Sequence, residues 1–168
     1  MNRVRILNKQ IAIWNKDPVI EVTFDIDTFT SKYDETIFRG EISLKFTLTG
    51  PEETLWAGKV NDGILLFNND FPLKPPTMKF LTDIDHPNIY NNDDSKGVVC
   101  ISILHEGIDE TGYEDEHSRW TPCHNLGSII RSVLTLFHEP FCESPANVDA
   151  SLLYTNDIEA LRTMIQEK

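Results

Sequence analysis

Four segments with the pattern of β-strands follow one another in the first half of the chain, and this succession most constrains the fold. Residues 20–26 and 42–48 alternate apolar and polar side chains, which is typical of half-buried strands. Residues 63–67 and 77–81 are expected to form two further strands. Because no helical pattern separates these segments, they predict an antiparallel meander. Residues 27–41 have no clear period and predict a long loop or an irregular hairpin.

Helical patterns flank the meander on both sides. Residues 2–16 carry one apolar stripe and end at Asp17-Pro18, and their basic residues lie largely off the stripe and are expected to face solvent. Residues 125–137 predict a second helix, and residues 148–165 predict one or two short ones. The predicted fold class is therefore α+β, with an amino-terminal helix, a four-stranded antiparallel meander, a loop region and two or more carboxy-terminal helices.

The length and the charge limit the possible functions. A chain of 168 residues is expected to form a single domain, residues 1–168. Its net charge of -12 argues against a nucleic-acid partner, since phosphate binding requires a basic face. Residues 1–16 carry +4, so the remaining residues carry -16. This basic segment is either a docking surface or an ordinary solvated helix face.

The cysteines indicate the compartment. The chain has three cysteines: Cys100, Cys123 and Cys142. An odd count without a CxxC pair argues against a disulfide framework and against a zinc site. We therefore expect a reducing compartment, the cytosol or the nucleus. No segment resembles a signal peptide or reaches the ~20 apolar residues that span a membrane.

One stretch is arranged to present a thiol beside a fixed amide. His86-Pro87-Asn88 leads into a polar loop, and the loop delivers Cys100 just before an apolar run. Considered alone, a cysteine between Val99 and Ile101 is better explained as an inert core thiol. Asn88 is also a residue that favours a turn after proline.

Further motifs around this stretch resemble those of ubiquitin-conjugating enzymes, in the order in which that family carries them. They are Gly50-Pro51-x-x-Thr54, Phe71-Pro72-x-x-Pro75-Pro76, His86-Pro87-Asn88, Gly97-x-x-Cys100-Ile101-Ser102-Ile103-Leu104, Trp120-x-Pro122 and the run from Ser144 to Ala150. Each motif alone is weak evidence, but their common order on a helix–meander–helix layout is strong. The resemblance implies the UBC fold over about residues 1–150.

The resemblance implies three catalytic residues. Cys100 would accept ubiquitin from the activating enzyme as a thioester and pass it to a lysine, or to a cysteine of a ligase. Asn88 would donate its side-chain amide near the developing oxyanion, or brace the loop around the thiol. Ser144 would flank the incoming lysine, although it is equally explained as a turn residue before Pro145. His86 is interpreted as structural.

The resemblance also implies partners. The activating enzyme would dock on Arg3, Arg5 and Lys9. A RING-type ligase would bind Leu73, for which core packing is the alternative, together with Pro122 and Cys123. We expect a monomer with no bound cofactor or metal, ATP being consumed by the activating enzyme.

An acidic insert narrows the resemblance. We define it as residues 106–118; it holds six acidic residues and no Lys or Arg. Together with Gly112-Tyr113-Glu114 and Arg119-Trp120, it resembles the subclass that carries an acidic loop after the active-site cysteine. Members of that subclass build degradation-type chains with RING ligases, some in endoplasmic-reticulum quality control and some in the cell cycle. A solvated mobile loop is the simpler reading.

Several departures from the family pattern keep other functions open. The loop between Asn88 and Cys100 is a few residues longer than usual, Phe141 replaces the usual Asn, and Arg131 stands on the helix face that would hold donor ubiquitin. One alternative is therefore a conjugating enzyme for a ubiquitin-like modifier. Another is a non-catalytic scaffold that binds ubiquitin or ligases. A cysteine protease is disfavoured, since the motifs suggest no partner pair of His with Asp or Asn.

Overall fold

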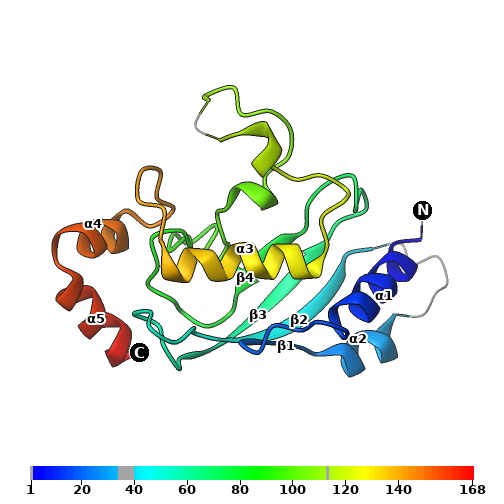
Figure 1. Ribbon diagram of the computed structural model, residues 1–168, viewed down its shortest axis with the longest axis horizontal. Coiled ribbons are helices and arrows are strands. Elements are labelled where there is room, and N and C mark those ends of the chain that lie inside the picture. Colours follow the sequence, from blue (N-terminus) through cyan, green and yellow to red (C-terminus); the bar gives the residue numbers. More distant parts are fainter. Residues whose placement is uncertain (1, 34–39, 113) are drawn as a thin grey trace.

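The computed structural model describes residues 2–33, 40–112 and 114–168. A four-stranded sheet is crossed by one long helix, with further helices at the two ends of the molecule (Figure 1). The elements in chain order are α1 (Arg3–Trp14), β1 (Val22–Phe24), α2 (Ile26–Lys32), β2 (Ile42–Thr49), β3 (Val60–Phe67), β4 (Thr77–Phe80), the 3-10 turns η1 (Ser102–Leu104) and η2 (Glu116–Ser118), α3 (Leu126–His138), α4 (Val148–Asn156) and α5 (Ile158–Glu167).

The sheet confirms the predicted meander. Its strands lie in the order β1-β2-β3-β4, and every neighbouring pair is antiparallel. Leu44 of β2 stands opposite Leu65 of β3, which stands opposite Met78 of β4, so one face of the sheet is continuously apolar. Burial alternates along β2 and β3, as expected when a sheet has one core face.

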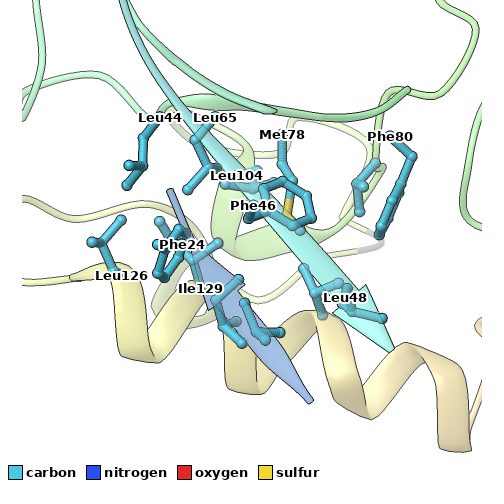
Figure 2. Close-up of a cluster of buried hydrophobic side chains, with 14 of the residues drawn as sticks. Phe24, Leu44, Phe46, Leu48, Leu65, Met78, Phe80, Leu104, Leu126 and Ile129 are labelled. Carbon is cyan, nitrogen blue, oxygen red and sulfur yellow. The ribbon is translucent and has the colours of Figure 1, made fainter. Parts of the chain in front are cut away.

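Helix α3 covers that apolar face. Asn125 caps its first turn by accepting the Ser128 N–H, and the Ser128 hydroxyl accepts the Asn125 N–H in return. The helix places Leu126 and Ile129 against side chains of the sheet, and Figure 2 shows them in one cluster with Phe24, Leu44, Phe46, Leu48, Leu65, Met78 and Phe80. The loop region after β4 is thus built around a rigid two-layer core.

The first strand is shorter than predicted, and a helix follows it. Ile20 is 93% exposed and lies outside β1, while Ile26 begins α2. The expectation of a long loop or an irregular hairpin over residues 27–41 is therefore wrong for residues 27–32, which belong to α2. Asp25 caps α2 by accepting the Thr28 N–H, and seven residues are too few to show a helical period. Residues 34–39 lie outside the described part of the chain.

Helix α1 confirms the helix predicted within residues 2–16, ending two residues earlier at Trp14, and it confirms the buried stripe. The buried apolar residues are Val4, Leu7, Ile11 and Trp14. The expectation that its basic residues face solvent holds for Arg5 and Lys9 but is wrong for Arg3, which is only 7% exposed. The Arg3 guanidinium donates hydrogen bonds to the carbonyl oxygens of Phe67, Asn68 and Gly40, and so ties α1 to the end of β3. Carbonyl groups at a strand end offer such acceptors, and no sequence period reveals them.

Candidate active site

Backbone contacts on both sides place Cys100 at the end of a short extended segment. Val99 lies between two neighbours, donating its N–H to Met78 O at 2.9 Å and bridging to Ile89. The Cys100 N–H donates to Asn88 O, also at 2.9 Å. The turn η1 then begins at Ser102, so the thiol stands at a fixed corner and remains partly exposed.

The longer loop between Asn88 and Cys100 does not displace these two residues. The Tyr90 N–H donates to Val98 O at 2.9 Å, and the Gly97 N–H donates to Tyr90 O at 2.8 Å, so the extra residues form a closed turn. Gly97 has a φ of 84°, and a Cβ atom there would lie 2.1 Å from Phe80 O. The turn therefore requires glycine at this position.

His86 is buried and structural, as interpreted. Its Nδ1 accepts the Asn88 N–H at 2.9 Å, so the ring proton lies on Nε2 and is donated to Leu136 O at 3.0 Å. The ring packs against Trp56 and Phe137, with centroids 4.5 and 5.1 Å apart. Burial lowers the pKa of His86 to about 4, so the imidazole is neutral at physiological pH.

The Asn88 side chain braces the segment that carries Ser144. Its Oδ1 accepts the Phe141 N–H at 2.8 Å, and its Nδ2 donates to Phe141 O at 2.7 Å. The neighbouring Asn147 N–H donates to Pro87 O at 2.9 Å. Since Asn88 holds residue 141 by backbone groups alone, the Phe141 departure does not disturb this contact.

Cys100, Asn88 and Ser144 border one open cavity of about 490 Å³. The structure therefore brings together the three residues that the sequence singled out. Other residues along the cavity are Ile101, Ser102, His105, Asp109, Thr111, Glu114, Asp115, Ser118, Arg119, Leu136 and Phe141. One wall is thus formed by the acidic insert, which projects away from the sheet (Figure 1).

Sequence reasoning missed a histidine and a carboxylate beside the thiol. His105 Nε2 lies 3.7 Å from Cys100 Sγ, and His105 Nδ1 lies 2.8 Å from Glu114 Oε1. Hydrogen bonding to Cys100, and then to Glu114, raises the pKa of His105 against the opposing effect of burial. In the sequence, only one feature indicated the contact between His105 and Cys100. His105 follows Cys100 by five residues, with the short turn η1 between them.

The described part of the acidic insert is anchored to the protein at several points. Arg119 donates from Nη1 to Glu114 Oε2 at 2.6 Å and from Nη2 to Glu106 O at 2.8 Å. Lys74 lies 3.7 Å from a Glu106 carboxylate oxygen. Tyr113, which contributed to the resemblance, lies outside the described residues.

The surfaces expected to bind partners differ in their exposure. Leu73 is 71% exposed, which excludes core packing, and Pro122 and Cys123 are also exposed. The two loops that carry them are joined, because Trp120 Nε1 donates to Pro72 O at 2.9 Å. Arg5 and Lys9 are exposed on α1, whereas the buried Arg3 is not available for docking.

Arg131 on α3 is engaged within the chain. Its Nη2 lies 2.6 Å from Asp17 Oδ2, and it also donates to Asp17 O at 3.2 Å. The charge that departs from the family pattern is therefore paired with the segment that follows α1, although both side chains remain at least half exposed.

Within residues 2–33, 40–112 and 114–168, no group of three or more His, Cys, Asp and Glu side chains is arranged to hold a metal ion. None of the helices in these ranges is long and apolar enough to cross a membrane.

Comparisons with known proteins agree with this architecture. The family model for ubiquitin-conjugating enzymes matches residues 8–168. The probable ubiquitin-conjugating enzyme E2 7 of Caenorhabditis elegans is 42% identical over 149 residues, covering 87% of this chain and 82% of the relative. The ubiquitin-conjugating enzyme E2 7 of Arabidopsis thaliana is 39% identical over 149 residues, covering 87% and 81%.

A solved structure also matches. Human ubiquitin-conjugating enzyme E2 G1 superposes with a TM-score of 0.62 at 34% identity, covering 82% of this chain and 95% of that one. The fold is that of the UBC class, whose members carry acyl groups on a cysteine. The chain belongs to the ubiquitin-conjugating enzyme family, whose members transfer ubiquitin through a cysteine thioester.

Proposed function

We propose that Cys100 is the cysteine that accepts ubiquitin from the activating enzyme and passes it to a lysine of a substrate or of another ubiquitin. One observation carries this assignment. Of the cysteines in the described residues, Cys100 alone borders the cavity that also contains Asn88 and Ser144. A thioester formed there would be open to an incoming amine and close to polar groups that can orient it.

The transfer step needs a neutral amine and a stabilised oxyanion. Asp109 and Asp115 at the cavity would attract a lysine ammonium group, which must release its proton before it attacks. Asn88 would hold the wall of the cavity in place, as the contacts of its side chain with Phe141 support. Because one N–H of its amide donates to Phe141 O, the second N–H would be the donor to the oxyanion. Ser144 would flank the amine at the cavity mouth.

We assign the chain to the subclass that carries an acidic loop and builds degradation-type chains with RING ligases. Support comes from the composition of residues 106–118 and from the contacts of Glu114, which bring the insert to the thiol.

The partner surfaces follow from exposure and charge. The activating enzyme would dock on Arg5 and Lys9, which are the exposed basic residues of α1. A RING-type ligase would bind Leu73 together with Pro122 and Cys123, because these exposed residues lie on two loops that are joined by the Trp120–Pro72 hydrogen bond. A cytosolic or nuclear location is supported by three free thiols, and no bound cofactor is required.

A loading assay tests the assignment. The wild type and the Cys100→Ser variant are incubated with ubiquitin, ATP and activating enzyme, and the products are resolved with and without reducing agent. Cys123→Ser and Cys142→Ser are matched controls. We expect the wild type and both controls to form a conjugate that the reducing agent removes, and Cys100→Ser to form at most a conjugate that resists it.

Other results would contradict the assignment. A reductant-sensitive conjugate on Cys100→Ser would place the acyl group on another cysteine. A conjugate with a ubiquitin-like modifier but not with ubiquitin would show that the protein carries that modifier instead of ubiquitin. Absence of a conjugate with every modifier would leave only a scaffold role.

A further inference from the structure

His105 lies between the Cys100 thiol and the Glu114 carboxylate. The Nε2–Sγ distance is 3.7 Å, and Nδ1 lies 2.8 and 3.1 Å from the two Glu114 oxygens. These distances are within hydrogen-bonding range for sulfur and oxygen respectively. Thiol, imidazole and carboxylate therefore form a continuous chain of contacts along one wall of the cavity.

The chain of contacts determines which imidazole nitrogen carries the proton. An ionised carboxylate only accepts hydrogen bonds, so Nδ1 must donate to Glu114. A neutral imidazole has a single N–H group, and its Nε2 therefore presents a lone pair to Cys100. This is the orientation in which a histidine can take a proton from a thiol.

Glu114 is itself held in place by several donors. Ser102 Oγ donates to Oε1 at 2.9 Å, and Arg119 Nη1 donates to Oε2 at 2.6 Å. The Glu114 N–H donates to Asp109 Oδ2 at 2.8 Å, which fixes the backbone as well. These contacts hold the Glu114 carboxylate, and with it the His105 imidazole, in one orientation.

The charges around His105 favour the imidazolium that forms when the neutral ring accepts a proton. On the side of the loop, Tyr90 interacts with Cys100, whose negative charge raises the pKa of the tyrosine hydroxyl. On the side of the insert stand Glu114, Asp109 and Asp115, with Arg119 opposing them behind Glu114. Acidic groups in contact with an imidazole favour its protonation.

We propose that His105 is a catalytic residue of the loading step, accepting the proton of the Cys100 thiol, and that Glu114 is its positioning residue. The inference rests on the proposed function, in which Cys100 is the acylated cysteine. The S–H proton moves to His105 Nε2, and the sulfur electron pair attacks the carbonyl carbon of the thioester on the activating enzyme. The bond from that carbon to the departing sulfur breaks. The departing thiolate then takes up a proton, which the imidazolium can return.

A purely structural role for His105, holding the insert against η1, predicts a different behaviour. Such a role would change how the insert sits but would not change the reactivity of the thiol in a way that depends on pH. Alkylation of Cys100 by iodoacetamide measures that reactivity without any activating enzyme, because only the thiolate reacts.

The experiment compares the wild type, His105→Gln and Glu114→Gln from pH 6 to 9.5, with alkylation of each cysteine quantified by peptide mass spectrometry. Cys123 and Cys142 are internal controls in the same sample. We expect alkylation of Cys100 at pH 7 to slow at least threefold in His105→Gln and by a smaller factor in Glu114→Gln, with both controls unchanged. The difference should disappear near pH 9.5, where an ordinary thiol ionises unaided.

The loading assay and the alkylation rate together distinguish a failure of this inference from a failure of the proposed function. If Cys100→Ser abolishes thioester formation but Cys100 of His105→Gln is alkylated at the wild-type rate at pH 7, the inference is overturned and the proposed function stands. A slowing that persists at pH 9.5 would also overturn it, because it would reflect access rather than ionisation. Should His105→Gln fail to fold, the alkylation rate of Glu114→Gln decides the question by the same criterion.

Discussion

His86 stands two residues before Asn88 and supports the site from within the core. It is fully buried, and its neutral form makes both of its hydrogen bonds within the chain. Protonation would place a charge beside Trp56 and Phe137 and would remove the acceptor for the Asn88 N–H. The ring therefore couples the stability of the Asn88 loop to pH.

We expect acid to destabilise the protein through His86. An unfolded histidine has a pKa of about 6.5, whereas burial lowers the pKa of His86 to about 4. The stabilisation is complete above pH 6.5 and is lost as the pH falls toward 4, because the unfolded state takes up the proton first. Between pH 7 and pH 5 the loss is about 2 kcal/mol.

Urea unfolding of the wild type and of His86→Gln at these two pH values measures the effect. The substituted protein should start less stable, but its stability should fall less between pH 7 and pH 5. Equal falls in the two proteins would show that His86 does not carry this pH dependence.

At the residue scale, short sequence motifs predicted site residues correctly where neighbouring residues hold the backbone in one conformation. Cys100, Asn88 and Ser144 were singled out by the motifs around them, and they do border one cavity. The contact between His105 and Glu114 could not be predicted in the same way. Glu114 lies in an insert without any period, and its position depends on Arg119 and Ser102, which no spacing rule connects to it.

At the scale of elements, α1 combines a structural cation with exposed ones. Arg3 reaches across to the end of β3 and to Gly40, whereas Arg5 and Lys9 stand in solvent. Arg3 stands four residues before Leu7, on the same helix face as the apolar stripe, whereas Arg5 and Lys9 lie on the opposite face. The carbonyl groups that α1 meets in the folded chain then give Arg3 its structural role.

We expect Arg3→Ala to destabilise the protein by about 3 kcal/mol, because the carbonyl oxygens of Phe67, Asn68 and Gly40 lose a charged donor. Arg5→Ala is the matched control, and its stability should stay within about 0.5 kcal/mol of the wild type. Urea unfolding at pH 7 provides the comparison. Similar losses in the two variants would contradict the structural role of Arg3.

Other elements show why boundaries were harder to predict than the existence of regular structure. The alternation in residues 42–48 predicted β2 well, because every second residue of the strand is buried in the core. Residues 20–26 show the same alternation, yet only Val22–Phe24 pair with β2. The chain leaves the sheet there because Asp25 caps α2, and a polar cap outweighs the propensity of a single apolar residue.

At the scale of the molecule, the contacts of Trp120 and Arg119 lead from the proposed ligase surface to the proposed thioester site. The loops of Leu73 and Pro122 are joined by the hydrogen bond from Trp120, and Arg119, the next residue, holds Glu114. Glu114 in turn contacts His105, which contacts the Cys100 thiol. The proposed ligase surface is thus connected to the proposed thioester site through a few direct contacts.

The assignment of Cys100 depends on where the acyl bond forms in the unmodified chain, and this location can be measured. Wild-type protein is loaded with ubiquitin, the remaining free thiols are blocked under non-reducing conditions, and the cysteines of the loaded fraction are identified by mass spectrometry after mild thioester cleavage. We expect Cys123 and Cys142 to carry the blocking group and Cys100 alone to be released unblocked. A loaded fraction in which Cys100 is blocked and another cysteine is released would contradict the assignment.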